Sequence, residues 1–385
     1  MDFRFSPEDE AFRRELLEFL KTELPAQREG LAESEYDADW EVTRAMRRKL
    51  AQRGWLVMHW PREYGGQGAS PLRQAIFDEE MAYHRAPGRD LFGARMLGPV
   101  LIKFGTEEQK RRFLPPIARG EVQWCQGYSE PGTGSDLASV STRATEDGDH
   151  WVVNGSKIWT SAAHRADWMF LLARTHPDAP RHRGLSLLLV DMKSPGVSVR
   201  PIRNMAGAHY FNQVFLDNVR VPKANLVGER GQGWYVALAV LDLERSAIEY
   251  SAVSRRLLDD VAAFAREHKR GGRPLLEDPR VRDRLAQRAV ECQVGRLMAY
   301  RVAWMQGQGL TPNKEASITK VFGSELLQRV AATAMEVLGL YGPLRPGDPW
   351  AKLGGRVQDL WLTSFAATIR AGTSEIQRNI IALRG

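Results

Sequence analysis

The sequence predicts an α+β protein with helices at both ends and β-strands in the middle. Apolar residues recur at helical spacing near the N-terminus and again beyond residue 231, whereas the stretch between holds short β-rich runs separated by turn residues. With 385 residues, the chain also exceeds the size at which one hydrophobic core usually stops growing. We therefore expect an N-terminal helical domain (residues 1–120), a middle β domain (121–230) and a C-terminal helical domain (231–385).

The N-terminal domain contains two predicted helix starts. Ser6 is a typical N-cap residue, and Pro7 favours the first helical position. A later helix is expected to begin after Thr106, whose hydroxyl can accept a hydrogen bond from the first turn. Apolar residues at helical spacing support the first helix, at Phe12, Leu16, Phe19 and Leu20.

Two polar turns interrupt the middle domain, at Tyr128–Asp136 and at Asn154–Ser161. In the first turn, Gly132 and Gly134 permit positive φ and a close approach of a ligand to the backbone. The second turn carries Trp159, a flat apolar face against which a planar cofactor can lie. Small hydroxyls suited to hydrogen bonding are supplied by Ser129, Ser135 and Ser161. Either turn alone is compatible with a plain hairpin and a core tryptophan, but the two together predict a ligand cradle.

The C-terminal domain begins with a long helix, predicted over about 232–268, that carries Glu244. A carboxylate on an apolar helix face is costly to bury alone, and desolvation raises its pKa, which suits a general base. A buried structural ion pair is an equally open alternative. Arg245 faces Asp242 and Glu249 on this helix, so an ion pair there is expected. The helical neighbours of Glu244 are all apolar: Val240, Leu241, Ala247 and Ile248.

A short helix is predicted at the end of the chain. Gly372 gives a tight turn, and Ser374 with Gln377 fits a capping box. The free N–H groups at such a helix start can bind an anion such as a pyrophosphate. A capped terminal helix without a ligand is the alternative.

Composition narrows the function classes. The net charge of +7 favours anionic ligands or an acidic partner, but the basic residues are scattered among acidic neighbours and form no block typical of nucleic-acid binding. Cys125 and Cys292 show no metal-ligand or redox-pair spacing. The N-terminus has no apolar signal-peptide core, and no apolar run reaches about 18 residues. We expect a cytoplasmic protein with no metal, no membrane span and no nucleic-acid partner.

Four motifs, in this order, resemble the acyl-CoA dehydrogenase family of flavoproteins. They are Ser129–Asp136, Asn154–Ser161, Leu241–Arg245 and Gly372–Asn379, and they span nearly the whole chain. The resemblance implies an N-terminal helical domain, a middle β-barrel domain and a C-terminal four-helix bundle. It also implies FAD as cofactor, an acyl-CoA substrate and α,β-dehydrogenation, in which a carboxylate removes the α-proton and the β-hydride passes to the flavin N5.

The resemblance also assigns roles to single positions. Ser135 would lie by the CoA pantetheine or the flavin, and Thr373 and Glu375 would lie near the FAD diphosphate. Asp242 and Arg245 would help to hold the CoA portion or the helix that carries the base. The residues implied to contact the isoalloxazine are Tyr128, Ser129, Trp159, Thr160 and Ser161.

The chain departs from the family pattern at the catalytic base. Most members have a glutamate just before the Gly-Thr of the C-terminal motif, where this chain has Ala371, and a methyl group cannot take a proton. A minority place the base on the earlier helix, at the Glu of an Asp-x-Glu-Arg sequence, which Glu244 matches. The resemblance then implies that Glu244 is the catalytic base. The backbone N–H of Ala371, with a flavin ribityl hydroxyl, would polarise the thioester oxygen.

Two further departures concern residues that members usually lend to the FAD of a neighbouring subunit. Where an Arg-x-x-Phe-Gly sequence is usual, this chain has His268 and Gly271 at the Arg and Phe positions, with two basic residues between them. Where a Gln is usually followed by paired glycines, it has Glu336 in place of the Gln and Leu340 in place of a glycine. Both changes together indicate an asymmetric assembly.

Several hypotheses stay open at this point. The chain can be a catalytically complete homo-oligomer, or one subunit of an α2β2 heterotetramer in which a second acyl-CoA dehydrogenase-like chain supplies the adenine side. The position of the base is compatible with branched or bulky acyl groups, in fatty acid or steroid side-chain degradation. A non-catalytic subunit, or a relative that catalyses flavin-dependent oxygenation, is a further hypothesis. An electron-transfer flavoprotein is the re-oxidant implied by the resemblance.

Overall fold

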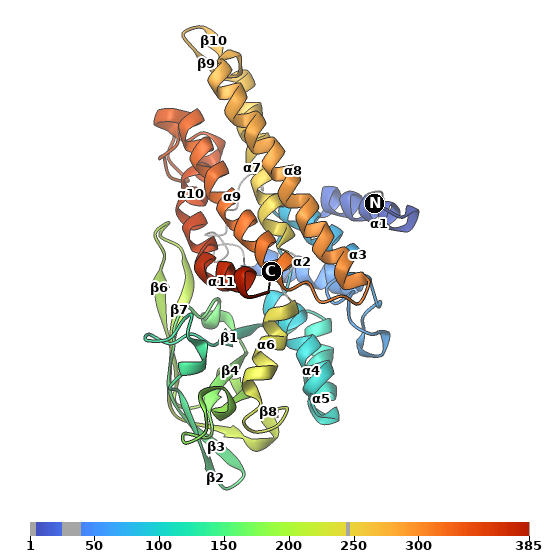
Figure 1. The fold of residues 1–385 in the computed structure, drawn as a ribbon, viewed down its shortest axis with the longest axis vertical. Coiled ribbons are helices and arrows are strands. Elements are labelled where there is room, and N and C mark those ends of the chain that lie inside the picture. Colours follow the sequence, from blue (N-terminus) through green and yellow to red (C-terminus); the bar gives the residue numbers. More distant parts are fainter. Residues whose placement is uncertain (1–4, 25–39, 244–246, 385) are drawn as a thin grey trace. The chain divides into compact units, whose positions relative to one another are not determined.

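The computed structural model describes residues 5–24, 40–243 and 247–384, without the side chains of residues 239–243. Helices come first and last along the chain and strands lie between them, so the predicted α+β class with a β-rich middle is confirmed (Figure 1). None of the helices within the described ranges is long and apolar enough to cross a membrane.

The chain folds into two compact units, each assembled from separate segments. The first unit comprises Met1–Ala38, Ala69–Pro87 and Arg245–Gly385, and the second comprises Asp39–Gly68 and Gly88–Glu244. The grouping by packing therefore differs from the order along the chain. The two boundaries of the three domains expected from the sequence remain a prediction.

The second unit is built on an eight-stranded mixed sheet. Its strand order is β6-β7-β3-β2-β4-β5-β8, and β1 pairs in parallel with β4. The strands are β1 (Trp124–Gly127), β2 (Arg143–Asp147), β3 (His150–Lys157), β4 (Trp168–Arg174), β5 (Leu185–Asp191), β6 (Val197–Arg203), β7 (His209–Pro222) and β8 (Leu226–Val227). The longer helices of this unit are α2 (Trp40–Gln52), α4 (Gly98–Phe104), α5 (Glu107–Ala118) and α6 (Gly233–Leu243).

Burial across this sheet follows from the strand sequences. β4 and β5 are near-continuous apolar runs, and their interiors are buried because both faces of these strands are covered. The edge strand β6 alternates exposed and half-buried residues. The core of this unit includes Trp151, Val153, Met169, Leu188, Val214 and Val221.

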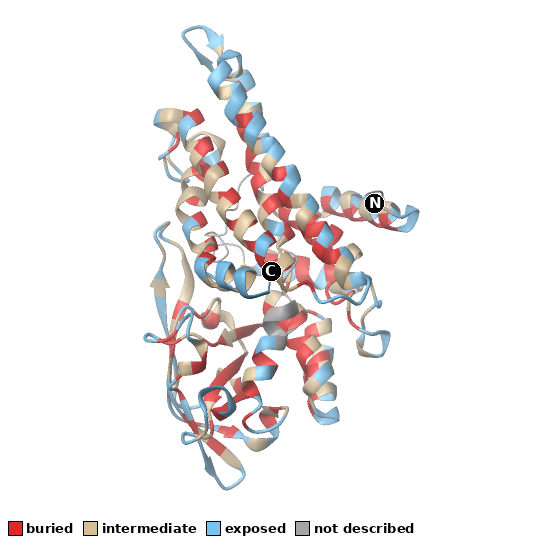
Figure 2. Ribbon diagram, viewed as in Figure 1, coloured by how far each residue is buried: buried red, intermediate tan, exposed pale blue. Residues whose placement is uncertain are grey.

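The first unit is a helical bundle. In it α9 (Lys314–Leu338) packs against α7 (Ile248–Glu267), α8 (Pro279–Gly307), α10 (Arg356–Ala367) and α11 (Ser374–Arg384), and α3 (Pro71–Tyr83) packs against α1 (Pro7–Glu23), α7 and α8 (Figure 1). The bundle core includes Leu257, Val261, Leu326, Val330 and Val337. Between α7 and α8, the short strands β9 (Lys269–Arg270) and β10 (Arg273–Pro274) form a largely exposed hairpin (Figure 2).

Both predicted helix starts are confirmed. The Ser6 hydroxyl accepts a hydrogen bond from the N–H of Asp9 at 3.1 Å, and Pro7 occupies the first helical position. Thr106 and Gln109 form a complete capping box at the start of α5. These starts could be predicted because a cap depends only on residues within one turn.

The predicted single helix over 232–268 is wrong. α6 ends at Leu243 and α7 begins at Ile248, and Ala247 has φ 51°, in the left-handed region. A left-handed residue cannot continue a right-handed helix. The apolar surroundings inferred for Glu244 from helical spacing therefore no longer follow, and Glu244 and Arg245 lie outside the described residues.

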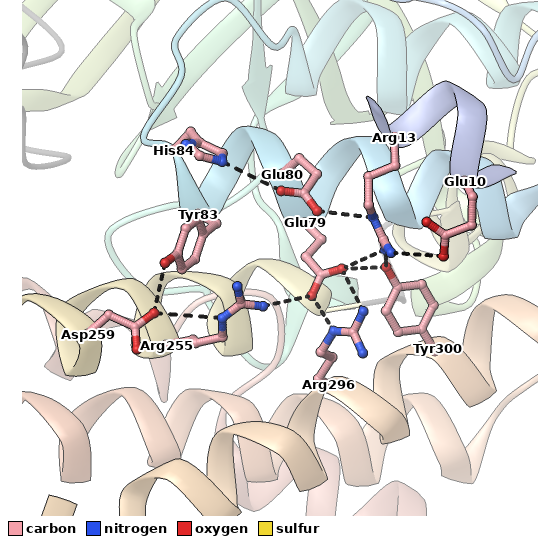
Figure 3. Close-up of polar contacts among 10 residues, drawn as sticks. All are labelled: Glu10, Arg13, Glu79, Glu80, Tyr83, His84, Arg255, Asp259, Arg296 and Tyr300. Atoms are coloured by element: carbon pink, nitrogen blue, oxygen red, sulfur yellow. Dashed lines mark hydrogen bonds and ion pairs between the residues drawn. The ribbon is translucent and has the colours of Figure 1, made fainter. Parts of the chain in front are cut away.

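A buried carboxylate joins four helices of the first unit (Figure 3). The Glu79 side chain, on α3, is 4% exposed. It accepts hydrogen bonds from Arg296 Nε at 2.5 Å and Tyr300 Oη at 2.5 Å, both on α8. Arg13 Nη2 of α1 lies 3.3 Å from the same carboxylate, and Arg255 Nη1 of α7 lies 3.9 Å from it. A buried charge needs such partners, so this cluster fixes how α1, α3, α7 and α8 meet.

Neighbouring groups extend the Glu79 cluster. Arg13 Nε lies 3.1 Å from Glu80 Oε1, and the Tyr83 hydroxyl donates to Asp259 at 2.8 Å (Figure 3). Burial, and secondly the adjacent Glu79, raise the pKa of Glu80. Guanidinium groups and carboxylates thus alternate through the cluster, which keeps its charges paired.

We predict that Glu79→Gln lowers the free energy of unfolding by about 3–5 kcal/mol, because it leaves half-buried guanidinium groups facing a neutral amide. Urea unfolding followed by circular dichroism measures the change. Glu325→Gln is the matched control, since Glu325 pairs with Arg378 at the surface and should cost less than about 1 kcal/mol. Equal effects of the two substitutions would contradict a central role for the Glu79 cluster.

Candidate active site

The two polar turns of the second unit lie side by side. The first follows β1. The predicted turn over Asn154–Ser161 is half wrong, because β3 continues through Lys157 and only the residues after it leave the strand. The N–H of Ile158 donates to the carbonyl of Ser129 at 2.9 Å. Within the first turn, Glu130 and Thr133 exchange two backbone hydrogen bonds of 2.9 Å. The predicted juxtaposition of the turns is therefore present in the structure.

Glu130 and Lys157 form a buried ion pair that we did not predict from the sequence. Lys157 Nζ donates to Glu130 Oε1 at 2.7 Å and to the carbonyl of Tyr128 at 3.1 Å. The Lys157 side chain is 0% exposed and that of Glu130 is 4% exposed. The signal was available, because Lys157 shares the buried strand parity of Trp151 and Val153, and a lysine on a core face requires an acid.

The surroundings of this pair set the protonation of both groups. Burial opposes ionisation of Glu130, but the Lys157 ammonium and the N–H groups of Ser141 and Thr142 outweigh it and lower the pKa of Glu130 to about 2. Burial lowers the pKa of Lys157 to about 8, against the opposite effect of Glu130. Glu130 is therefore ionised at neutral pH, whereas Lys157 loses its proton more readily than an ordinary lysine does.

The residues predicted to contact the flavin ring differ in exposure and in their hydrogen bonds. Trp159 has φ 58° and is 56% exposed, which is unusual for a tryptophan. Thr160 is buried, and its hydroxyl has no hydrogen-bond partner in the described part of the chain. Tyr128 is buried edge-on against Phe170, with ring centroids 5.8 Å apart. An exposed aromatic face beside an unpaired buried hydroxyl fits the flavin ring that the resemblance implies.

The remaining residues of the two turns are open to solvent to different degrees. Ser129 and Ser161 are half-buried, and Ser135 is exposed. Gly132 and Gly134 do not use the positive φ that glycine permits, since neither lies among the positive-φ residues. A Cβ at either glycine would meet no atom within 4 Å. Neither backbone strain nor packing thus requires glycine here, and the free space agrees with a ligand close to the main chain.

In the first unit, the start of α11 differs by one residue from the prediction. α11 begins at Ser374, and the Thr373 hydroxyl caps it by accepting from the N–H of Ile376 at 3.2 Å. Gln377 Nε2 donates to the carbonyl of Ala371 at 3.0 Å and not to a capping box with Ser374. Gly372 has φ 79°, outside helical geometry, and the helix begins two residues after it. The cap is therefore Thr373 and not Ser374.

The residue before this start has an unusual backbone. Ala371 has φ 53°, and its N–H makes no hydrogen bond within the described residues. Ser374 is buried, and its hydroxyl is also without a partner in that part of the chain. Two donors at one helix start therefore remain available to a ligand, in keeping with the role implied for the Ala371 N–H.

Charged groups at the start of α11 modify its affinity for anions. The N–H of Glu375 and then the Thr373 hydroxyl lower the pKa of the Glu375 carboxyl, so a negative charge already faces the helix start. Lys320 Nζ donates to the carbonyl of Gly372 at 2.7 Å and brings a cation to the same turn. Anion binding here would depend on Lys320 as well as on the helix.

The β9–β10 hairpin and the end of α9 hold the two departures at the adenine side. Gly271 and Gly272 have φ 60° and 81°, which is the two-residue turn that glycine pairs favour. Glu336 is paired with Arg284, and Leu340 is 91% exposed. A Cβ at Gly339 would lie 3.3 Å from Arg270 Nη2, so hairpin and helix end are neighbours. This surface thus presents an ion pair and an apolar side chain where the resemblance implies cofactor contacts in most members.

Asp242, Glu244 and Arg245 were expected to bind CoA or act as the base. The main chain of α6 reaches Leu243, but the Asp242 side chain is not described, and Glu244 and Arg245 fall outside the described residues. Their roles therefore remain predictions from the sequence.

Comparison with known proteins decides the family. The acyl-CoA dehydrogenase N-terminal domain matches residues 6–121, the middle domain matches 125–219 and the C-terminal domain matches 231–385. The chain belongs to the acyl-CoA dehydrogenase family. It is an oxidoreductase of that family, as the resemblance of its motifs implied.

Individual relatives agree along nearly the whole chain. Acyl-CoA dehydrogenase IpdE1 of Mycobacterium tuberculosis is 42% identical over 351 residues, which cover 90% of this acyl-CoA dehydrogenase and 88% of that protein. A chain of the ChsE4-ChsE5 complex from Mycobacterium tuberculosis is 38% identical with a TM-score of 0.91, covering 100% of this chain and 98% of the other. A chain of the Tcur3481-Tcur3483 steroid ACAD is 35% identical with a TM-score of 0.92 and the same coverage.

We predict that the Glu130–Lys157 pair gives this acyl-CoA dehydrogenase a specific acid sensitivity. Because the folded pKa of Glu130 is about 2 and its ordinary value is 4.5, its contribution is complete above pH 4.5 and is lost as the pH falls toward 2. The full loss is on the order of 3 kcal/mol. Urea midpoints between pH 6 and pH 3 should fall less steeply for Glu130→Gln/Lys157→Met than for the wild type. Parallel profiles would refute this assignment.

Proposed function

We propose that this chain is a subunit of an FAD-dependent acyl-CoA dehydrogenase in which Glu244 removes the α-proton of the acyl group. The observation that carries the proposal is Ala371. A methyl group stands where most family members have the base, while the N–H of the same residue lacks a partner in the described part of the chain. The Asp-x-Glu-Arg sequence at Asp242–Arg245 supplies the alternative carboxylate.

The chain's own residues would hold cofactor and substrate as follows. FAD, when bound, would accept the β-hydride at its N5. Trp159 would cover a face of the isoalloxazine, and Thr160 would give its unpaired hydroxyl to the ring edge. Ser135 would contact the pantetheine or the flavin. Further contacts with the ring, the diphosphate and the CoA portion are proposed for Tyr128, Ser129, Ser161, Thr373, Glu375, Asp242 and Arg245.

The Ala371 N–H would act on the thioester oxygen. Removal of the α-proton places negative charge on that oxygen, and a preorganised donor stabilises such charge. Ala371 lies before the first residue of α11, so its N–H takes no part in the hydrogen bonds of that helix. The same residue would therefore have lost the base but kept the donor.

We further propose an α2β2 assembly with a second acyl-CoA dehydrogenase-like chain. His268 and Gly271 replace the residues that would reach a neighbour's diphosphate, and Glu336 brings a negative charge that is paired with Arg284 within the chain. The similarity to a chain of the ChsE4-ChsE5 complex supports a partner of this kind. The partner would supply the adenine side of the FAD site.

A bulky acyl group is the substrate class we favour. Support comes from the similarity to a steroid ACAD and from the position of the proposed base. An electron-transfer flavoprotein is the proposed re-oxidant, and the net charge of +7 would suit an acidic docking partner. Flavin bleaching by short, branched, aromatic and steroid-type CoA esters would rank the substrate classes.

We predict that Glu244→Gln lowers the rate of flavin bleaching by acyl-CoA at least about 10²-fold, because the amide cannot accept the α-proton. The Kd for acyl-CoA should change little, since the amide keeps the shape of the side chain. Stopped-flow absorbance and a binding titration measure the two quantities. Glu108→Gln, an exposed carboxyl on α5, is the control and should bleach at the wild-type rate. Undiminished bleaching by Glu244→Gln would remove it as the base.

We predict that the chain expressed alone is nearly colourless and gains FAD when coexpressed with its partner, because the adenine side of the site is missing. Flavin absorbance per polypeptide measures the occupancy. A fully yellow protein with about one flavin per chain would favour the catalytically complete homo-oligomer instead.

A further inference from the structure

The ammonium of Lys157 acts on one particular peptide group. Lys157 Nζ donates to the carbonyl oxygen of Tyr128 at 3.1 Å, and its second bond, to Glu130, is 2.7 Å long. The side chain is 0% exposed, so water does not compete for these bonds. A buried charge-assisted bond to a main-chain carbonyl fixes the direction in which that carbonyl points.

Glu130 holds the lysine in this place. Glu130 Oε2 accepts from the N–H and the hydroxyl of Ser141, both at 2.7 Å, and Oε1 accepts from the N–H of Thr142 at 2.9 Å. The carboxylate is thus anchored to the segment that enters β2, independently of the two turns. Lys157 therefore has little freedom to shift away from the Tyr128 carbonyl.

The bond to the Tyr128 carbonyl also fixes the direction of the Ser129 N–H, which belongs to the same peptide group. Because a trans peptide is planar, its C=O and N–H point in opposite directions. With the carbonyl bound to Lys157, the N–H of Ser129 points away from the ion pair, and it makes no hydrogen bond among the described residues. The Ser129 carbonyl is separately held by Ile158 N at 2.9 Å. An ammonium on the carbonyl also polarises the amide and makes its N–H a stronger donor.

We propose that Lys157 and Glu130 are positioning residues that aim and polarise the Ser129 N–H toward an acceptor atom at the edge of the isoalloxazine. This inference rests on the proposed function, in which the Tyr128–Ser129 segment contacts that ring. A donor of this kind stabilises negative charge on the ring and so favours its reduced form. The ion pair would then set both the affinity for FAD and the midpoint potential of the bound flavin.

The test compares flavin-loaded proteins, in the complex with the partner chain if the chain alone binds no FAD. Glu130→Gln/Lys157→Met removes both charges together, so that no buried charge is left unpaired. We expect its Kd for FAD to rise about tenfold or more and its midpoint potential to become more negative. Val221→Ala, which removes buried methyl groups from the same sheet, is the matched control. This variant should keep the Kd for FAD within about twofold of the wild-type value and should leave the midpoint potential unchanged.

A second variant separates aiming from polarisation. Glu130→Gln/Lys157→Gln keeps a neutral donor for the Tyr128 carbonyl but has no ammonium. We expect the Kd for FAD to stay within about threefold of the wild type while the potential still becomes more negative. This variant also serves if the methionine variant does not fold.

The outcomes distinguish this inference from the proposed function. Variants that bind FAD with the wild-type Kd and potential would overturn the inference and leave the ion pair with a structural role only. A wild-type protein that binds no FAD, even with its partner chain, would overturn the proposed function and the inference together.

Discussion

A charge removed from water must be met by opposite charges or by hydrogen-bond donors, and both units of this chain are organised around such a group. In the helical unit, Glu79 gathers arginines from α1, α7 and α8. In the β unit, Glu130 joins Lys157 to the segment entering β2. Neither carboxylate could be buried unless its partners lay within hydrogen-bonding distance of it. The packing of each unit therefore depends on the relative placement of segments far apart in the sequence.

That dependence explains which features the sequence could predict. The caps at Ser6 and Thr106 were correct because a cap involves residues within one turn. The apolar runs of β4 and β5 were recognisable because continuous burial needs no partner identity. Strand parity could have indicated that Lys157 is buried, but not its partner, because Lys157 and Glu130 are 27 residues apart and Glu79 and Arg296 are 217 apart. Local patterns do not indicate which distant charges will meet.

The errors at the candidate site have a related origin. Helical periodicity continued through Ala247, yet the backbone there is left-handed, and no side-chain pattern signals such a break for an alanine. The glycines of the first turn were expected to serve the backbone, but Gly132 and Gly134 have neither positive φ nor close neighbours. The space that a side chain would fill at these two positions is therefore open to a molecule bound against the turn. Of the two reasons first given for these glycines, positive φ does not apply, whereas a close approach of a ligand to the backbone stays a prediction.

The start of α11 shows why a helix terminus alone does not define an anion site. The partial positive charge of the helix is met by the carboxylate of Glu375, which lies on the first turn. A diphosphate at this place would meet that carboxylate unless cations offset it, and Lys320 lies on the neighbouring Gly372 carbonyl. The donors at this turn that remain unengaged in the described residues include the Ala371 N–H and the Ser374 hydroxyl. Because Ala371 brings no carboxylate of its own, its N–H faces less negative charge than the usual glutamate would impose. The proposed move of the base from position 371 to Glu244 would therefore strengthen the donor at Ala371.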